Sequence, residues 1–141
     1  MVEESNDRHR IRLRGPWWRS IGRSFDPRHA TRVDWAAALA TPPTRVSTQQ
    51  RVDAFVLRRT FNSPTGLEDG DRLFLVLRQV DYVRSITLNG QGIWTGDETA
   101  SPHLEIEVSQ YLQDHNELEL LIAVPCPAPP RSHGEVALEI G

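Results

Sequence analysis

Four residues near position 100 carry side chains that together suit the recognition of a sugar. Trp94 supplies an aromatic ring, Asp97 and Glu98 supply carboxylates, and His103 supplies an imidazole, all within one short stretch. The apolar C–H face of a sugar stacks on an aromatic ring, and sugar hydroxyl groups hydrogen-bond to charged and polar side chains. The sequence therefore predicts a loop that binds a carbohydrate, with packing of Trp94 in the core as the alternative.

Three further tryptophans are candidates for the same site from other loops. Trp17 and Trp18 are adjacent, and Trp35 stands in a segment with little pattern. Adjacent residues of an extended chain point to opposite sides, so at most one of Trp17 and Trp18 enters a core easily. The other is expected at an edge, under a loop or at a surface site.

Nothing in the sequence supplies a catalytic pair. A glycosidase needs two carboxylates that face each other across a sugar, about 5 to 9.5 Å apart. Asp97 and Glu98 are neighbours in the chain and diverge, and no G-x-S-x-G nucleophile motif is present. We expect a protein that is not an enzyme.

The sequence predicts no cofactor and no metal cluster. The five histidines have no metal-ligand spacing, and Cys126 is the only cysteine. Glu68, Asp69 and Asp71 leave calcium binding open, although the chemistry of a turn also explains these acidic residues.

Short strands with turn signals between them fill most of the chain. Leu104, Ile106 and Val108 alternate with glutamates, and the stretch from Leu118 to Val124 alternates in the same way. A period of two places each apolar set on one face of a sheet. Further strands are expected at 10–14, 52–61, 73–77, 84–88, 91–95 and 136–140, with a hairpin turn at Asn89-Gly90.

The pattern predicts an all-β protein that folds as an antiparallel β-sandwich or barrel. Periodicity alone does not choose between an immunoglobulin-type sandwich and a jelly roll. Two interpretations remain open for residues 22–50: a short helix over 35–39, begun by Asp34 and ended by Pro42-Pro43, or a long loop packed over one end of the sandwich. We expect a flexible leader over 1–9 and a single β-sandwich domain over 10–141.

Composition restricts the partners and the location. The net charge is −3, and no apolar stretch is long enough to span a membrane, so we expect neither nucleic acid nor membrane as a partner. The charged N-terminus lacks the apolar core of a signal peptide, which makes the cytoplasm the default location.

All basic residues are arginines, and eight of the 16 fall within the first 32 positions. One interpretation is a basic arm for nucleic acid. The favoured one is that Arg10, Arg12 and Arg14 share one face of a strand and pair with glutamates on a neighbouring strand.

Several short motifs occur in an order and spacing that resemble one known module. They are Val56-Leu57-Arg58-Arg59-Thr60-Phe61 with Pro64, Gln79-Val80-Asp81-Tyr82, Ile86-Thr87-Leu88-Asn89-Gly90, Ser101-Pro102 and Asn116-Glu117-Leu118. Together they resemble the N-terminal sugar-binding domain of family-two glycoside hydrolases, the β-galactosidase and β-glucuronidase type. The resemblance implies a jelly roll of the galactose-binding-domain-like type.

The resemblance does not imply catalysis, because in that family the catalytic glutamates lie on a separate barrel. The loop after Asn89-Gly90 also departs from the family pattern. Residues 97–100 replace its glycine-rich loop, and His103 stands where an aromatic residue is usual.

Three functions follow as hypotheses. The first is a non-catalytic module that binds carbohydrate weakly through loop aromatics. The second is a structural or protein-interaction domain that kept the fold without a ligand and associates with itself or with a partner. The third is an accessory subunit of a split glycoside hydrolase.

Overall fold

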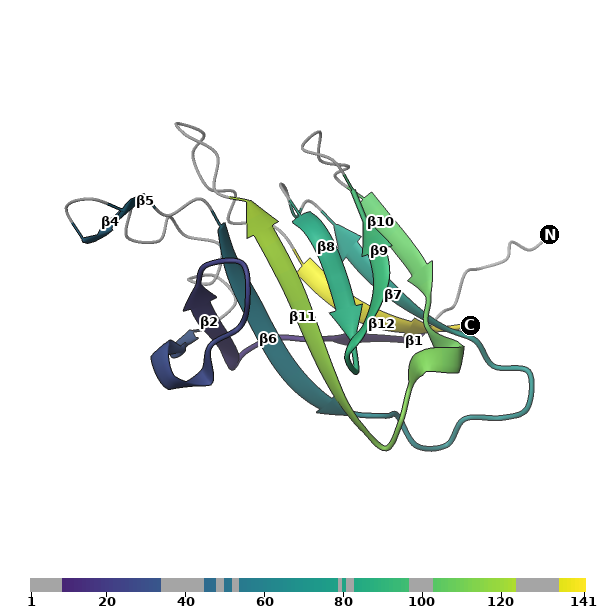
Figure 1. Cartoon of the computed structure of the whole chain (residues 1–141). Coiled ribbons are helices and arrows are strands. Elements are labelled where there is room, and N and C mark those ends of the chain that lie inside the picture. The colour runs from purple at the N-terminus through teal and green to yellow at the C-terminus, as the bar shows by residue number, and fades with distance from the viewer. Residues whose placement is uncertain are drawn as a thin grey trace.

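The computed structural model describes residues 9–33, 45–47, 50–51, 54–78, 80, 83–96, 103–123 and 135–141. These residues form two antiparallel sheets that face each other across a shared core (Figure 1). The all-β sandwich predicted from the alternating pattern is confirmed. The helix predicted over 35–39 lies outside the described residues.

One sheet has four strands in the order β1-β12-β7-β10. Its strands are β1 (His9–Arg12), β12 (Glu135–Ile140), β7 (Leu73–Arg78) and β10 (His103–Glu107). β7 is an inner strand of this sheet, because it pairs with β12 on one side and β10 on the other.

The other sheet has six strands in the order β3-β2-β6-β11-β8-β9. Its strands are β3 (Thr31–Val33), β2 (Trp17–Ile21), β6 (Ala54–Asn62), β11 (His115–Ala123), β8 (Val83–Leu88) and β9 (Gln91–Thr95). A separate hairpin pairs β4 (Arg45–Ser47) with β5 (Gln50–Arg51). Two single turns of 3₁₀ helix are η1 (Pro27–His29) and η2 (Ser109–Tyr111).

The core lies between the sheets and follows the predicted alternation. Leu118 and Leu120 of β11 and Leu75 and Leu77 of β7 are almost wholly buried. Leu104 and Ile106 of β10 are partly buried against the same cluster. Fully burying one such side chain contributes about 1.5–3 kcal/mol, so these inward rows hold the sheets together.

The predicted hairpin turn is present between β8 and β9. Asn89 has φ 54° and Gly90 has φ 82°, so both residues adopt the left-handed conformation that a type I′ turn requires. Asparagine and glycine tolerate this region better than other residues.

The predicted charge pairing of the first strand is confirmed for two arginines. Nε of Arg10 lies 3.1 Å from a carboxylate oxygen of Glu139, and Nε of Arg12 lies 3.4 Å from one of Glu135. Arg78 of β7 also contacts both glutamates. Side chains from three neighbouring strands therefore form one ion-pair network on the outer face of the four-stranded sheet.

No helix among the described residues is long and apolar enough to cross a membrane.

Candidate functional site

Trp17 belongs to the core and is not available to bind a ligand. Its side chain is 0% exposed, and its indole Nε1 donates a hydrogen bond to the carbonyl oxygen of Leu13 at 3.0 Å. This bond ties the segment between the two sheets to β2. The ring has no exposed face on which a ligand could stack.

Trp94 packs along the edge of the sandwich. It is partly buried against the core cluster, and it stands opposite the fully buried Ile86 in the β8–β9 ladder. Its six-membered ring covers Gly96 so closely that a Cβ atom there would lie 2.2 Å from Cη2 of the ring. Packing against the core, the alternative to sugar binding for Trp94, therefore accounts for much of the surface of its side chain.

His103 lies on a different sheet from Trp94. It is exposed at the start of β10 and stands opposite Arg78 in the ladder with β7. Because Arg78 bonds Glu135 and Glu139 on the outer face, His103 shares that outer face. Asp97, Glu98 and Trp35 lie outside the described residues.

The described members of the predicted sugar site are thus dispersed. Trp17 faces the core, Trp94 covers an edge, and His103 lies on the outer face of the four-stranded sheet. Trp18 is the remaining predicted residue, and its side chain is 44% exposed.

Trp18 lies in a row of side chains across the outer face of the six-stranded sheet. In the ladders it stands opposite Arg32 of β3 on one side and Arg58 of β6 on the other, and Arg58 in turn stands opposite Glu119 of β11. Directly opposed residues share a face and lie about 4.5–5.5 Å apart at Cβ. We call the surface formed by Trp18, Phe25, Arg32, Arg58, Glu117 and Glu119 the Trp18 face.

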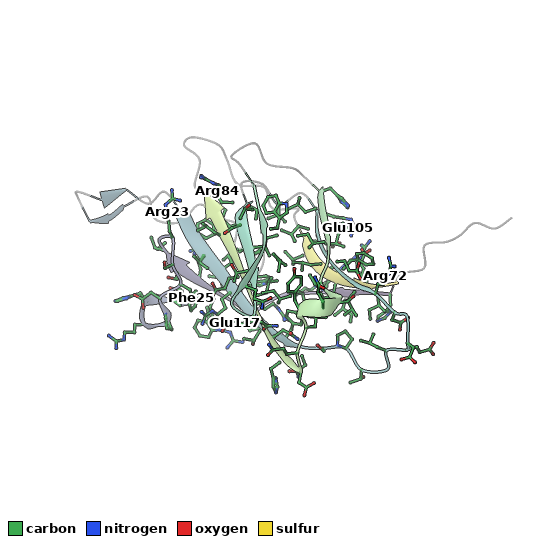
Figure 2. All side chains as sticks on the ribbon, turned by 45° about the vertical axis from the view of Figure 1, so that its right-hand side comes forward. Arg23, Phe25, Arg72, Arg84, Glu105 and Glu117 are labelled. Carbon is green, nitrogen blue, oxygen red and sulfur yellow. The ribbon has the colours of Figure 1, made fainter. Side chains whose placement is uncertain are left out.

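Arg58 is held from three directions at the centre of the Trp18 face. Its Nε donates to Glu119 at 2.9 Å, and its Nη1 lies 3.3 Å from a carboxylate oxygen of Glu117. The ring of Phe25 lies against the guanidinium, with 3.8 Å between Cζ and the ring centroid. Figure 2 shows Phe25 and Glu117 close together beside this sheet. A planar guanidinium stacked on a ring and bonded at its edge has little rotational freedom.

The segment that carries Phe25 is positioned by Asp26. The backbone N–H of Asp26 donates to Oγ of the buried Ser20 at 2.9 Å, which fixes the segment to β2. The Asp26 carboxylate caps η1 by accepting from the backbone N–H of Arg28 at 3.0 Å, and it lies 2.7 Å from Nδ1 of His29. The hydrogen bond with His29, together with the Arg28 N–H and the His29 charge, lowers the pKa of Asp26.

Two arginines on the inward side of the same sheet serve packing. Arg19 of β2 lies over the ring of Phe55, and burial lowers its pKa. Arg59 of β6 donates to the carbonyl oxygens of Arg14 and Thr60, and burial lowers its pKa as well. These contacts explain why Arg59 interrupts the apolar alternation of its strand.

Sequence reasoning missed Phe25, Arg58 and Glu119 as members of a site. The strands of Arg58 and Glu119 were predicted, and the period of two places both residues away from the core. What the sequence does not show is that β2, β6 and β11 are neighbours, since their order is set by long-range pairing.

The carboxylates of the Trp18 face do not form a catalytic pair. Glu117 and Glu119 are two positions apart on β11, and both turn towards the guanidinium of Arg58. They therefore converge on one cation and do not face each other across a space for a sugar.

No group of three His, Cys, Asp or Glu residues in the described part of the chain is arranged to hold a metal ion. Asp71, one of the three acidic residues considered for calcium, accepts a hydrogen bond from the backbone N–H of Glu68 at 2.8 Å. The chemistry of a turn thus accounts for Asp71.

Solved structures of glycosidases contain the same fold. An FMN-binding β-glucuronidase from Faecalibacterium prausnitzii superposes with a TM-score of 0.70 at 17% identity, over 94% of this chain and 22% of that one. A β-D-glucuronidase from Dictyoglomus thermophilum gives 0.69 at 12% identity, over 97% and 29%. A putative β-galactosidase from Bacteroides fragilis gives 0.65 at 17% identity, over 94% and 23%. The resemblance predicted from the sequence is confirmed at the level of the fold.

The chain spans about a fifth to a third of the length of these glycosidases. The comparison therefore concerns one β-sandwich within each larger enzyme. No known family profile matches the chain, and no curated protein sequence matches it.

Proposed function

We propose that this chain is a non-catalytic β-sandwich module that binds carbohydrate weakly on the Trp18 face. The observation that carries the proposal is the half-exposed ring of Trp18 beside the fixed guanidinium of Arg58. A large aromatic ring beside charged hydrogen-bonding groups is the combination that suits a sugar.

The geometry provides both parts of sugar recognition on one surface. Trp18 offers an apolar face for C–H groups, and its side chain has only two torsions to restrict when a ligand binds. Arg58 and Glu119 offer a donor and an acceptor that are already positioned by each other and by Phe25. Groups that are positioned before binding lose less freedom when the ligand arrives.

The fold supports the same class of ligand. The solved structures that share the fold include a β-D-glucuronidase and a putative β-galactosidase. In them a sandwich of this kind accompanies other parts of a longer chain, because the match covers 29% or less of each. We therefore assign a binding role, and no chemical step, to the sandwich.

The test is a titration of intrinsic tryptophan fluorescence with glucose, galactose, their uronic acids and short oligomers of each. We expect a saturable change with at least one sugar at millimolar concentration, where binding is worth about 4 kcal/mol. Trp18→Ala should abolish the change. Leu67→Ala is the matched control, because Leu67 is the other large apolar residue of the described chain with a well-exposed side chain, at 40%.

The absence of any response up to tens of millimolar, where binding is worth only about 2–3 kcal/mol, would overturn the proposal. So would a response that survives in Trp18→Ala. The protein-interaction hypothesis would then become the better one, because tryptophan and arginine are the residues enriched at energetic centres of protein interfaces.

A further inference from the structure

We propose that the Trp18 face selects saccharides that carry an oxyanion, either a uronate carboxylate or a sulfate ester, and that Arg32 reads this group. This inference rests on the proposed function and adds the class of ligand and the residue that determines it. It depends on a difference between the two arginines that flank Trp18.

The two arginines stand on opposite sides of Trp18 in adjacent ladders. Arg58 lies towards the centre of the sheet, and Arg32 lies on the edge strand β3. Both therefore point to the same face as the exposed ring, within reach of a sugar stacked on it.

The charge of Arg58 is already neutralised. Its guanidinium contacts both Glu117 and Glu119, and its side chain is only 25% exposed. A ligand can hydrogen-bond to this cluster, but it meets acidic groups as well as the cation. The β11 side of the Trp18 face therefore favours neutral hydroxyl groups over an anion.

Arg32 offers the opposite environment. It is exposed, and it makes no ion pair or hydrogen bond through its side chain within the described part of the chain. An exposed guanidinium is solvated in the free protein and gains little from a neutral sugar. It forms short, paired hydrogen bonds with a carboxylate or a sulfate, whose planar or tetrahedral oxygens match its fork.

The two ends of the Trp18 face therefore differ in charge. The β3 end is cationic through Arg32, Trp18 supplies the stacking surface in the middle, and the β6–β11 end supplies mixed donors and acceptors. A hexose ring stacked on Trp18 would direct an oxyanion at its C6 position towards β3 and its hydroxyls towards Glu119.

The experiment compares sugars that differ only at C6. Glucose, glucuronate and glucose 6-sulfate, and the matching galactose series, are titrated at constant ionic strength while the indole N–H signals of the full chain are followed by NMR. The buried Trp17 provides an internal reference signal. We expect the Trp18 signal to move with the anionic sugars at roughly two- to fivefold lower concentration than with the neutral ones, the size expected of a surface ion pair.

Arg32→Gln and Arg28→Gln form a matched pair of variants. Each removes one exposed positive charge, but Arg28 lies on η1 outside the row of Trp18. Arg32→Gln should bring the anionic sugars down to the affinity of the neutral ones, and Arg28→Gln should leave the preference intact. A preference for only one of the two anions identifies the source as carboxylate or sulfate.

Other outcomes overturn the inference in distinguishable ways. Equal affinity for neutral and anionic sugars, all sensitive to Trp18→Ala, would reject the role of Arg32 and leave the proposed function standing. An equal loss in Arg32→Gln and Arg28→Gln would show general electrostatic attraction in place of a local contact. No movement of the Trp18 signal with any sugar would reject both proposals.

Discussion

The side-chain amide of Asn89 donates a hydrogen bond to the Oδ1 of Asn116 at 2.9 Å, and this contact joins the β8–β9 hairpin to the start of β11. Oδ1 of Asn89 accepts from the backbone N–H of Glu117 at 2.9 Å. Asn116 is 2% exposed and also bonds Gln113 and Ser63. Two asparagines that belong to different motifs of the resemblance thus form one structural network.

Asn116→Ala should lower the free energy of unfolding by roughly 1–3 kcal/mol. The change removes the common acceptor of the Gln113 N–H and the Asn89 amide in a partly buried place and leaves the Asn89 amide only the carbonyl oxygen of Tyr111; a group that loses its partner on burial costs about this much. Urea unfolding followed by far-UV circular dichroism measures it.

Asn89→Gly is the companion change from the other side of the network, because glycine keeps the positive φ of the turn and removes only the side-chain bonds to Asn116, Tyr111 and Glu117. It should cost less than Asn116→Ala. Equal stability of wild type and Asn116→Ala would show that the network does not contribute.

The fold was predictable from the sequence wherever the side-chain pattern is local. The strict alternation of β11 predicts its buried residues, and Asn89-Gly90 predicts the hairpin turn; the structure contains both. Arg10 pairs with Glu139, 129 positions away. The sequence predicts a glutamate partner on a neighbouring strand for Arg10, but it does not identify that strand. The partner could not be named because antiparallel strands of similar composition fit several orders equally well.

Gly96→Ala should destabilise the chain by about 1–3 kcal/mol and displace Trp94. The added Cβ would lie 2.2 Å from Cη2 of the ring, so either the ring or the strand end must shift. Near-ultraviolet circular dichroism, which reports on the packing of tryptophan rings, should change together with the free energy of unfolding.

Gly92→Ala supplies the comparison, since a Cβ there meets no atom within 4 Å. A Gly96→Ala protein with wild-type stability and an unchanged tryptophan spectrum would contradict the packing described for Trp94.

Glu139→Gln should lower the free energy of unfolding by roughly 1–2 kcal/mol. Glu139 is 5% exposed and accepts from Nε of Arg10 at 3.1 Å and from Nη2 of Arg78 at 3.0 Å. Loss of one partner from a buried ion pair costs more than this, but both arginines are about a third exposed, so water screens the effect.

Glu135→Gln should cost less, because Glu135 is 24% exposed. Raising the salt concentration to about 1 M should narrow the gap between wild type and each variant. A gap that grows with salt would argue against an electrostatic origin.

Asp26→Asn should remove a contribution to stability that depends on pH. Folding lowers the pKa of Asp26 from its ordinary value of 3.8, so the ionised carboxylate stabilises the folded state. This contribution is fully present above that value and is lost as the pH falls through the lowered pKa of the folded state.

The wild type should therefore be more stable than Asp26→Asn at pH 7, and the difference should shrink as the pH falls below about 4. Chemical unfolding of both proteins at pH 7, 5 and 3 measures the difference. A constant difference over that range would show that the charge of Asp26 is not involved.

The candidate site was harder to predict than the fold, because it depends on which strands are neighbours. The sequence indicates that at most one of Trp17 and Trp18 enters the core easily, but it does not say which. Arg58 gains its partners from Phe25, 33 positions earlier, and Glu119, 61 positions later. Interactions over such separations follow from the order of strands and not from any local motif.

The pairing of His9 with Ile140 makes the two ends of the described sandwich adjacent in one sheet. A force applied at these two points would separate β1 from β12 one residue pair at a time, because the strands are antiparallel and the load falls on the nearest pair first. Mechanical resistance should therefore be low, and the ion pairs of Arg10 and Arg12 should break early. In a longer chain that carried this sandwich, the segments before and after it would meet it at nearly the same point. The sandwich would then project to one side and would not separate the neighbouring parts of the chain.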